Sequence, residues 1–192
     1  CLLCLVEPFV AIWLGKDFVL TKAILILAVA IYYFKGINSG IDIAKNAAGL
    51  YYPDRFIPMA EAIANMVISI VLAKRYGIAG VLFGTLVSFL ALSFWAKPYF
   101  VCRDVFEVSF ARYAVREGRE IVVSVLVAAG TWYAVSLVSL ENVLLSFGVK
   151  ALLALALSNG LLLLVYFKTS EFQYLRGLLE SAANRIGKRE KA

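Results

Sequence analysis

The chain has 192 residues, of which 62% are apolar and 17% are charged, and it contains no histidine. Water-soluble domains average about 45–50% apolar and about 25% charged residues, so the composition excludes an ordinary soluble protein. Without histidine, histidine-based catalytic triads and most zinc hydrolase sites are also excluded. The net charge is +6, but the basic residues fall between long apolar stretches, which indicates membrane topology rather than nucleic-acid binding.

The chain opens on an apolar run that starts at Cys1. This run lacks the basic patch, short apolar core and cleavage site of a signal peptide. It is typical of the end of a spanning helix, so we expect the chain to be the C-terminal part of a longer protein. The three cysteines, Cys1, Cys4 and Cys102, are interpreted as small apolar core residues, because an odd count does not form a complete disulfide framework. We expect neither a metal nor a cofactor.

Five later segments are long and apolar enough to cross a bilayer, which takes about 20 residues of helix. Each carries few charges or none. In chain order they are residues 18–50, 56–73, 76–96, 121–140 and 142–167. The sequence therefore predicts an all-α, polytopic membrane protein with five full transmembrane helices and part of a sixth.

The first of these spans carries an unusual set of polar residues after its apolar core. At about 100° per residue they fall within an arc of roughly 100° on one helix face; they are Lys35, Asn38, Asp42, Lys45 and Asn46. One interpretation is a polar stripe that lines a water-filled cavity. The alternative is that Lys35 and Lys45 reach the interface while Asp42 pairs with Lys45 one turn away.

The next two spans carry a second polar row and a row of small residues. Glu61, Asn65 and Ser69 step by four along one helix face. Glu61 is either a proton or cation site, a partner for a lysine on a neighbouring helix, or a hydrated residue near the helix end. The small residues Gly77, Gly80, Gly84 and Ser88 predict close helix packing rather than binding.

The connecting segments give an independent test of this topology, because adjacent spans alternate sides. Residues 97–119 form a mixed-charge connector, within which 105–119 is expected to be a cytoplasmic interfacial helix. The tail, residues 169–192, is expected to be a basic amphipathic segment on the cytoplasmic leaflet. Of the 19 Lys and Arg residues, 14 fall on one side, which predicts that this side and the C-terminus are cytoplasmic.

Residues 5–105 resemble the C-terminal half of polysaccharide and O-antigen flippases of the multidrug/oligosaccharidyl-lipid/polysaccharide exporter superfamily. The order and spacing of several short features carry the resemblance: Glu7-Pro8, Trp13-Leu14-Gly15, Ala48-Gly49, Arg55 with Pro58, Asn65, Gly77-x-x-Gly80-Val81, Gly84-Thr85 and Ser88. It implies two six-helix lobes around a cavity, with alternating access. Residues 1–104 are then the last helices of the second lobe, and 120–168 hold two additional transmembrane helices.

The resemblance implies a cytoplasmic-membrane flippase, not an enzyme, that moves a polyprenyl-(di)phosphate-linked oligosaccharide for O-antigen, lipopolysaccharide or related polysaccharide biosynthesis. Its expected partners are this lipid-linked oligosaccharide, membrane lipids, the missing N-terminal half of the transporter and polysaccharide polymerase or assembly proteins, but no nucleic acid. Cationic and polar groups would bind the phosphate and sugar: Lys35, Asn38, Lys45, Arg55 and Asn65. Asp42 and Glu61 would bind a coupling ion or balance charge. The alternatives are a multidrug exporter of organic cations and a non-transporting membrane component of polysaccharide assembly.

Overall fold

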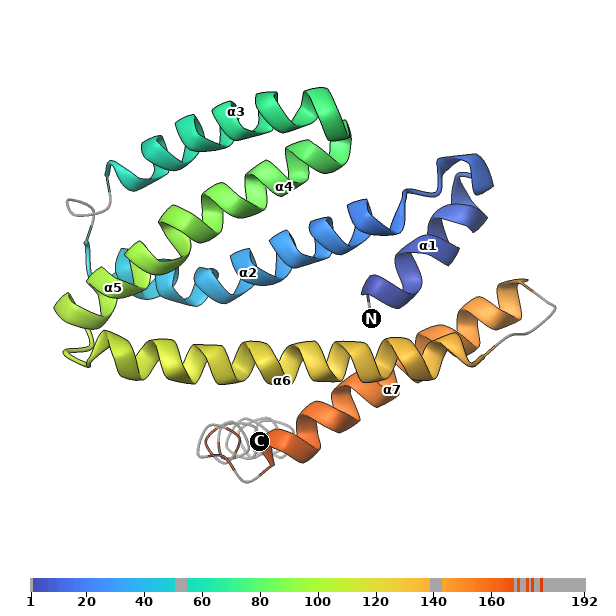
Figure 1. Cartoon of the computed structure of the whole chain (residues 1–192). Coiled ribbons are helices and arrows are strands. Elements are labelled where there is room, and N and C mark those ends of the chain that lie inside the picture. Colours follow the sequence, from blue (N-terminus) through green and yellow to red (C-terminus); the bar gives the residue numbers. More distant parts are fainter. Residues whose placement is uncertain are drawn as a thin grey trace, which may run out of the picture. The chain divides into compact units, whose positions relative to one another are not determined.

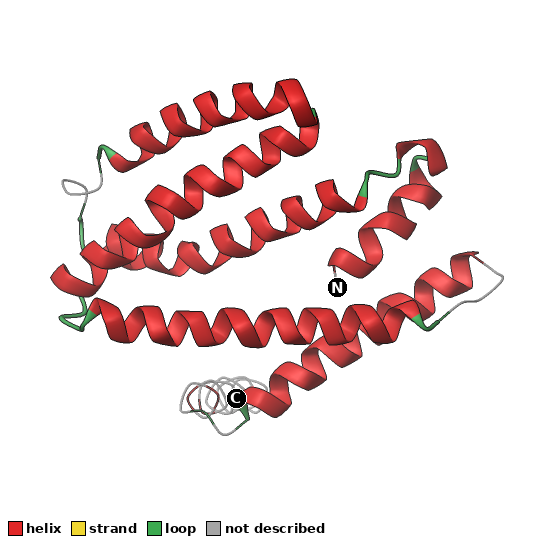
Figure 2. Cartoon of the chain, in the orientation of Figure 1, coloured by secondary structure: helices red, strands yellow, loops and turns green. Residues whose placement is uncertain are grey.

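The structure is a computed structural model that describes residues 2–50, 55–138 and 143–167, together with residues 169, 172, 174 and 177. Every regular element in these residues is helical, and none of them lies in a strand (Figure 1 and Figure 2). Five helices in this part of the chain are long and apolar enough to cross a membrane. The predicted all-α fold with five full spans is therefore confirmed.

The helices follow the predicted spans in order. α1 (Leu2–Trp13) lies where the end of a further span was predicted, and a single 3-10 turn, η1 (Lys16–Phe18), follows it. The five longer helices are α2 (Lys22–Ala47), α3 (Ile57–Tyr76), the continuous helix Ile78–Asp104, α6 (Phe110–Ser136) and α7 (Val143–Tyr166). The helix Ile78–Asp104 consists of α4 (Ile78–Ser88), a π-helical segment η2 (Phe89–Ser93) and α5 (Phe94–Asp104).

Local sequence explains where α3 begins and ends. Pro58 lies in its first turn, where a residue without a backbone N–H removes no helical hydrogen bond. At the other end Gly77 has a φ of 56° and donates its N–H to the Ala73 carbonyl. Glycine adopts this backbone conformation without the penalty of a Cβ. Gly77 therefore ends α3 and turns the chain directly into α4.

The predicted connector over 97–119 is divided differently in the structure. Residues up to Asp104 continue the preceding helix, and residues from Phe110 onward form the first turns of α6, so 105–119 is not a separate interfacial helix. The break is confined to 105–109, where Glu107 has a φ of 53°. Phe110 packs edge to face on Trp95 and Tyr99, with ring centroids 6.3 and 5.7 Å apart. These aromatic contacts stabilise both helix ends beyond the purely apolar stretches.

Two of the four small residues predicted to pack closely, Gly80 and Gly84, approach α3, whereas Gly77 precedes α4 and is exposed. Gly80, Gly84 and Ser88 are buried. A Cβ on Gly80 would lie 2.4 Å from the backbone oxygen of Leu72, and a Cβ on Gly84 would lie 2.6 Å from Oγ of Ser69. The α3–α4 backbones therefore approach as closely as glycine permits, which is how helices associate in a membrane without a hydrophobic driving force.

Side-chain contacts fix the directions in which the three helices around η2 run. Asn38 contacts Ser93 and Asp42 contacts Lys97, both at a sequence separation of 55 residues. A constant separation shows that α2 runs parallel to α5. On the other side of the long helix, Asn65 contacts Thr85 and Ser69 contacts Val81, so partner numbers fall along α4 as they rise along α3. The α3–α4 pair is antiparallel, and the helix Ile78–Asp104 lies between α2 and α3.

The chain divides into two compact units at residue 124. The first unit, from Leu2 to Ser124, contains α1 to α5, the first half of α6 and all the predicted site residues. The second unit contains the rest of α6 and α7, on which Ala154 is buried. The predicted amphipathic tail, 169–192, falls mostly outside the described residues.

Candidate functional site

The polar stripe predicted on α2 divides into two groups with different surroundings. Asn38 is buried, with 2% of its surface exposed, and Asp42 and Lys45 are partly buried, so these three side chains face the neighbouring helix. Lys35 is exposed. The stripe covers an arc of roughly 100° on α2, so α5 can pack against one edge of it and leave the edge that carries Lys35 exposed.

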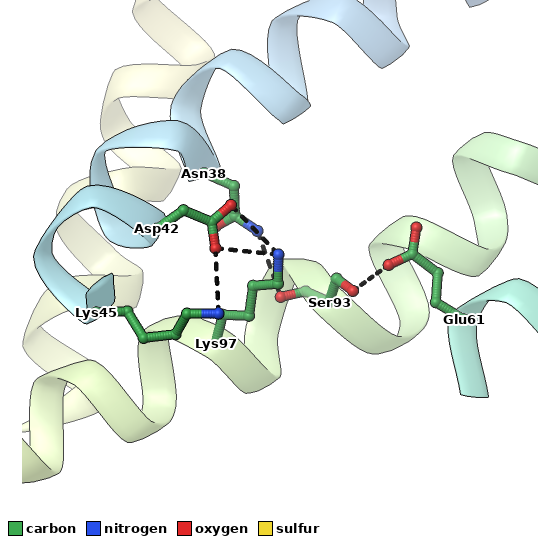
Figure 3. A network of polar contacts seen from close by, with 6 residues as sticks. All are labelled: Asn38, Asp42, Lys45, Glu61, Ser93 and Lys97. Carbon is green, nitrogen blue, oxygen red and sulfur yellow. Dashed lines mark hydrogen bonds and ion pairs between the residues drawn. The ribbon is translucent and has the colours of Figure 1, made fainter. Parts of the chain in front are cut away.

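Asp42 lies between two lysine side chains (Figure 3). Nζ of Lys97, on α5, is 3.1 Å from Oδ1 and 3.3 Å from Oδ2 of Asp42. Nζ of Lys45, one turn along α2, is 3.8 Å from Oδ1. The predicted Asp42–Lys45 pair is therefore present, but the shorter contact joins Asp42 to another helix. The side chains of Lys97 and Lys45 are only 15% and 13% exposed, against 38% for Asp42.

Ser93 connects three helices at the end of the π-helical segment (Figure 3). Its backbone oxygen accepts a hydrogen bond of 3.3 Å from Nδ2 of Asn38 on α2, and its hydroxyl donates to Oε2 of Glu61 on α3. Ser93 is fully buried. Oδ1 of Asn38 is also buried and has no described donor. Together with the Asp42–Lys97 pair, these contacts form a polar network of six residues: Asn38, Asp42, Lys45, Glu61, Ser93 and Lys97.

The charged members of this network lie toward one end of the helices that supply them. Lys45 is in the last turn of α2, Glu61 is four residues after the start of α3, and Lys97 is seven residues before Asp104. By the predicted topology this is the cytoplasmic end. Among the described residues, Glu61 accepts the hydroxyl of Ser93, and its predicted roles as a proton or cation site or as a hydrated residue stay predictions.

Asn65 makes a separate contact between α3 and α4. Its Oδ1 accepts hydrogen bonds from Oγ of Ser69 at 2.8 Å and from Oγ1 of Thr85 at 3.3 Å. These hydroxyls also lie near the backbone oxygen of Val81, at 3.3 and 3.1 Å. The structure thus places Asn65 in a helix–helix contact, one turn beyond Glu61, rather than in the six-residue network.

The remaining predicted cations lie apart from one another. Nζ of Lys35 is 5.9 Å from the centre of the Phe89 ring, at the start of η2. Lys35 is 13 residues after Lys22 and 12 residues before Ala47, which is the middle of α2. Arg55 is exposed just before α3, with its guanidinium 4.4 Å from the centre of the Phe56 ring.

Lys97 and Ser93 were not among the predicted site residues, although both belong to the network. The sequence predicts Lys97 in the connector, because the uncharged run ends at residue 96. Its position four residues after Ser93 puts both on one helix face, which is a pattern that the sequence contains. The sequence does not show that this face packs against Asn38 and Asp42, which lie 55 residues earlier in the chain.

In the described part of the chain, no group of three or more His, Cys, Asp or Glu residues is placed to hold a metal ion. Cys4 and Cys102 are free thiols, and Cys102 is buried. Comparisons of the chain with protein-family models, with curated proteins and with solved structures found no match. A function must therefore be argued from the residues and their geometry.

Proposed function

We propose that this chain is the C-terminal membrane part of a carrier that moves a polyprenyl-(di)phosphate-linked oligosaccharide across the cytoplasmic membrane. The observation that carries the proposal is the position of Lys35. It is an exposed lysine in the middle of a helix that is long and apolar enough to span a bilayer. No described carboxylate pairs with it, and its described contact is the Phe89 ring.

The energetics favour a functional role for this lysine. A lysine at the centre of a membrane helix costs about 2.5–3.5 kcal/mol even on the most permissive scale. A cation–π contact returns roughly 0.5–2 kcal/mol, depending on how far the pair is desolvated. The remaining cost is removed by water, by an anion or by extension of the side chain to the interface. An exposed lysine in this position therefore supports a polar path through the membrane and an anionic ligand.

A lipid-linked oligosaccharide matches the groups around Lys35. Its phosphate or diphosphate is anionic, its sugars are polar and its polyprenyl tail is apolar. Gly36, Ser39 and Gly40 are exposed on α2 beside Lys35, and no atom lies within 4 Å of where a Cβ on either glycine would be. This small and partly polar surface leaves room for a headgroup. Asp42 is the one acidic residue of α2, and its lysine partners disfavour an organic cation as cargo.

Complementation of a flippase-deficient strain by the full-length protein tests the proposal. We expect surface polysaccharide to return and the accumulated lipid-linked precursor to fall. Lys35→Ala should reduce this activity about tenfold or more, which corresponds to the loss of roughly 1.4 kcal/mol of binding, and Lys35→Arg should retain most of it because the charge is kept. Lys22→Ala removes the same charge at the exposed start of the same helix and serves as the matched control.

Two outcomes contradict the proposal. If Lys35→Ala complements as well as Lys22→Ala does, Lys35 does not bind the phosphate. If the full-length protein restores resistance to organic cations and leaves surface polysaccharide absent, the protein is a multidrug exporter instead.

A further inference from the structure

We infer that Asp42 and Lys97 are an internal ion pair that ties α2 to α5, so that the two helices move as one body and Asp42 is not an ion-coupling residue. Two contacts at the same 55-residue separation carry this inference. Lys97 Nζ lies 3.1 and 3.3 Å from the two carboxylate oxygens of Asp42, and Asn38 Nδ2 lies 3.3 Å from the Ser93 oxygen one turn away.

The charges of this pair are matched across the helix interface. Lys97 is 15% exposed and lies within a helix that can span a membrane, so its ammonium needs a partner. Asp42 supplies that partner with both carboxylate oxygens. Lys45 also approaches Asp42, at 3.8 Å, but it belongs to the same helix. Lys45 can neutralise Asp42 and cannot hold α2 against α5.

The surroundings of the tie explain why a specific contact is needed here. The π-helical segment Phe89–Ser93 and Pro98 both interrupt the regular hydrogen bonding of the long helix in this region. The contacts at Ser93 and Lys97 lie between these two interruptions, because Ser93 ends the π segment and Lys97 directly precedes Pro98. They therefore fix the position of α5 relative to α2 where the helix itself is least regular.

A cycle of variants in the detergent-solubilised protein tests the tie without reference to any substrate. Lys97→Met and Asp42→Asn each leave one charge without its interhelical partner, and we expect the apparent melting temperature to fall by about 5 °C or more. In the double variant Asp42→Asn/Lys97→Met the melting temperature should fall by much less than the sum of the two single decreases. In the exchanged pair Asp42→Lys/Lys97→Asp part of the lost melting temperature should be recovered. Lys22→Met is the matched control, and its melting temperature should change little. Additive losses in the double variant, or a Lys97→Met variant as stable as Lys22→Met, would overturn the ion pair.

A cross-link tests whether the two helices move together. Asp42→Cys/Lys97→Cys, in a background without the native cysteines, should regain stability when a short bifunctional thiol reagent joins the two positions. We expect transport to be regained with it, because the cross-link replaces a tie that stays closed. Regained stability with transport abolished would show that α2 and α5 must separate, and would overturn the inference. This arm requires a transport assay, so it rests on the proposed function, whereas the stability cycle holds whatever the protein carries.

Discussion

The polar side chains of Asp42, Glu61, Asn65, Lys35 and Lys97 lie in different surroundings within the membrane helices of the first unit. Asp42 and Lys97 pair across a helix interface. Glu61 accepts the hydroxyl of a buried serine, and Asn65 accepts two hydroxyls at once. Lys35 lies near an aromatic ring and has no described carboxylate partner. These differences separate residues that hold helices together from Lys35, which we propose binds the ligand.

At Asn65 a measurement can distinguish a residue that holds helices together from one that binds a ligand. Replacing Asn65 by Ala removes the acceptor shared by Ser69 of the same helix and Thr85 of α4. It should destabilise the protein by roughly 0.6–1.7 kcal/mol, from the average to the largest value measured for a hydrogen bond between membrane helices. Both hydroxyls retain the Val81 oxygen as a second acceptor, which keeps the loss small. Reversible unfolding in mixed micelles gives the free energy of unfolding directly.

Asn159→Ala is the control for this measurement. Asn159 donates to the Leu155 oxygen of its own helix at 2.8 Å, so its removal breaks no described contact between helices, and we expect a smaller effect. If transport falls strongly in Asn65→Ala while the free energy of unfolding does not change, Asn65 binds substrate instead of joining helices.

At the scale of elements, the helix Ile78–Asp104 organises the first unit. α3 packs on its first half through glycines, and α2 packs against α4 and α5 and makes the polar contacts at Ser93 and Lys97. The two interfaces use different chemistry. In the α3–α4 interface, close approach of the backbones maximises van der Waals contact. The interface of α2 with the helix Ile78–Asp104 depends instead on charged and hydrogen-bonded groups whose partners lie on the other helix.

Gly80→Ala should separate α3 from α4. The new Cβ would lie 2.4 Å from the backbone oxygen of Leu72, and a backbone atom cannot move aside as a side chain can. Overpacking of this kind costs about 1–3 kcal/mol, so the melting temperature in detergent should fall by roughly 2–10 °C.

Gly118→Ala, on α6, supplies the comparison for Gly80. No atom lies within 4 Å of where its Cβ would be, and alanine is the better helix former by up to about 1 kcal/mol. We expect this variant to be at least as stable as the parent protein. Equal stability of Gly80→Ala and Gly118→Ala would mean that α3 and α4 do not pack as closely as described.

For the whole molecule, the arrangement of charges agrees with a single direction of insertion. The end of α2, the start of α3 and the end of α5 lie together through the six-residue network. The same end of the first unit carries most of its Lys and Arg in the sequence-based count. Which side of the membrane this end faces stays a prediction, because five apolar helices can insert in either direction.

Labelling of single cysteines in intact cells tests the orientation. Asp17→Cys, between α1 and α2, should react with a membrane-impermeant maleimide, because this connection is predicted to be outside. Ser109→Cys, between α5 and α6, should react only after the cells are permeabilised. Both variants are made after replacement of Cys1, Cys4 and Cys102, and unlabelled parent protein is the control. The reverse pattern would place the C-terminus outside.

The sequence by itself determined the class of the protein, the number of its full spans and their order. Hydropathy acts over about 20 neighbouring residues, so these properties are local and can be counted along the chain. The same holds for the glycine and serine row of α4, because its spacing of four is a property of one helix. The predicted Asp42–Lys45 pair was also correct, since both residues lie on α2.

Only the tertiary structure decided which polar residues meet. Asp42 selects Lys97 over Lys45 as its closer partner, and Ser93 joins Asn38 to Glu61, across separations of 55 and 32 residues. Aromatic packing across 105–109 likewise extends α5 and α6 into the segment predicted as a connector. The physical reason is the same in each case. The cost of a buried charge or an exposed helix end is set by what packs against it, and the packing of one helix on another is not encoded in the periodicity of either.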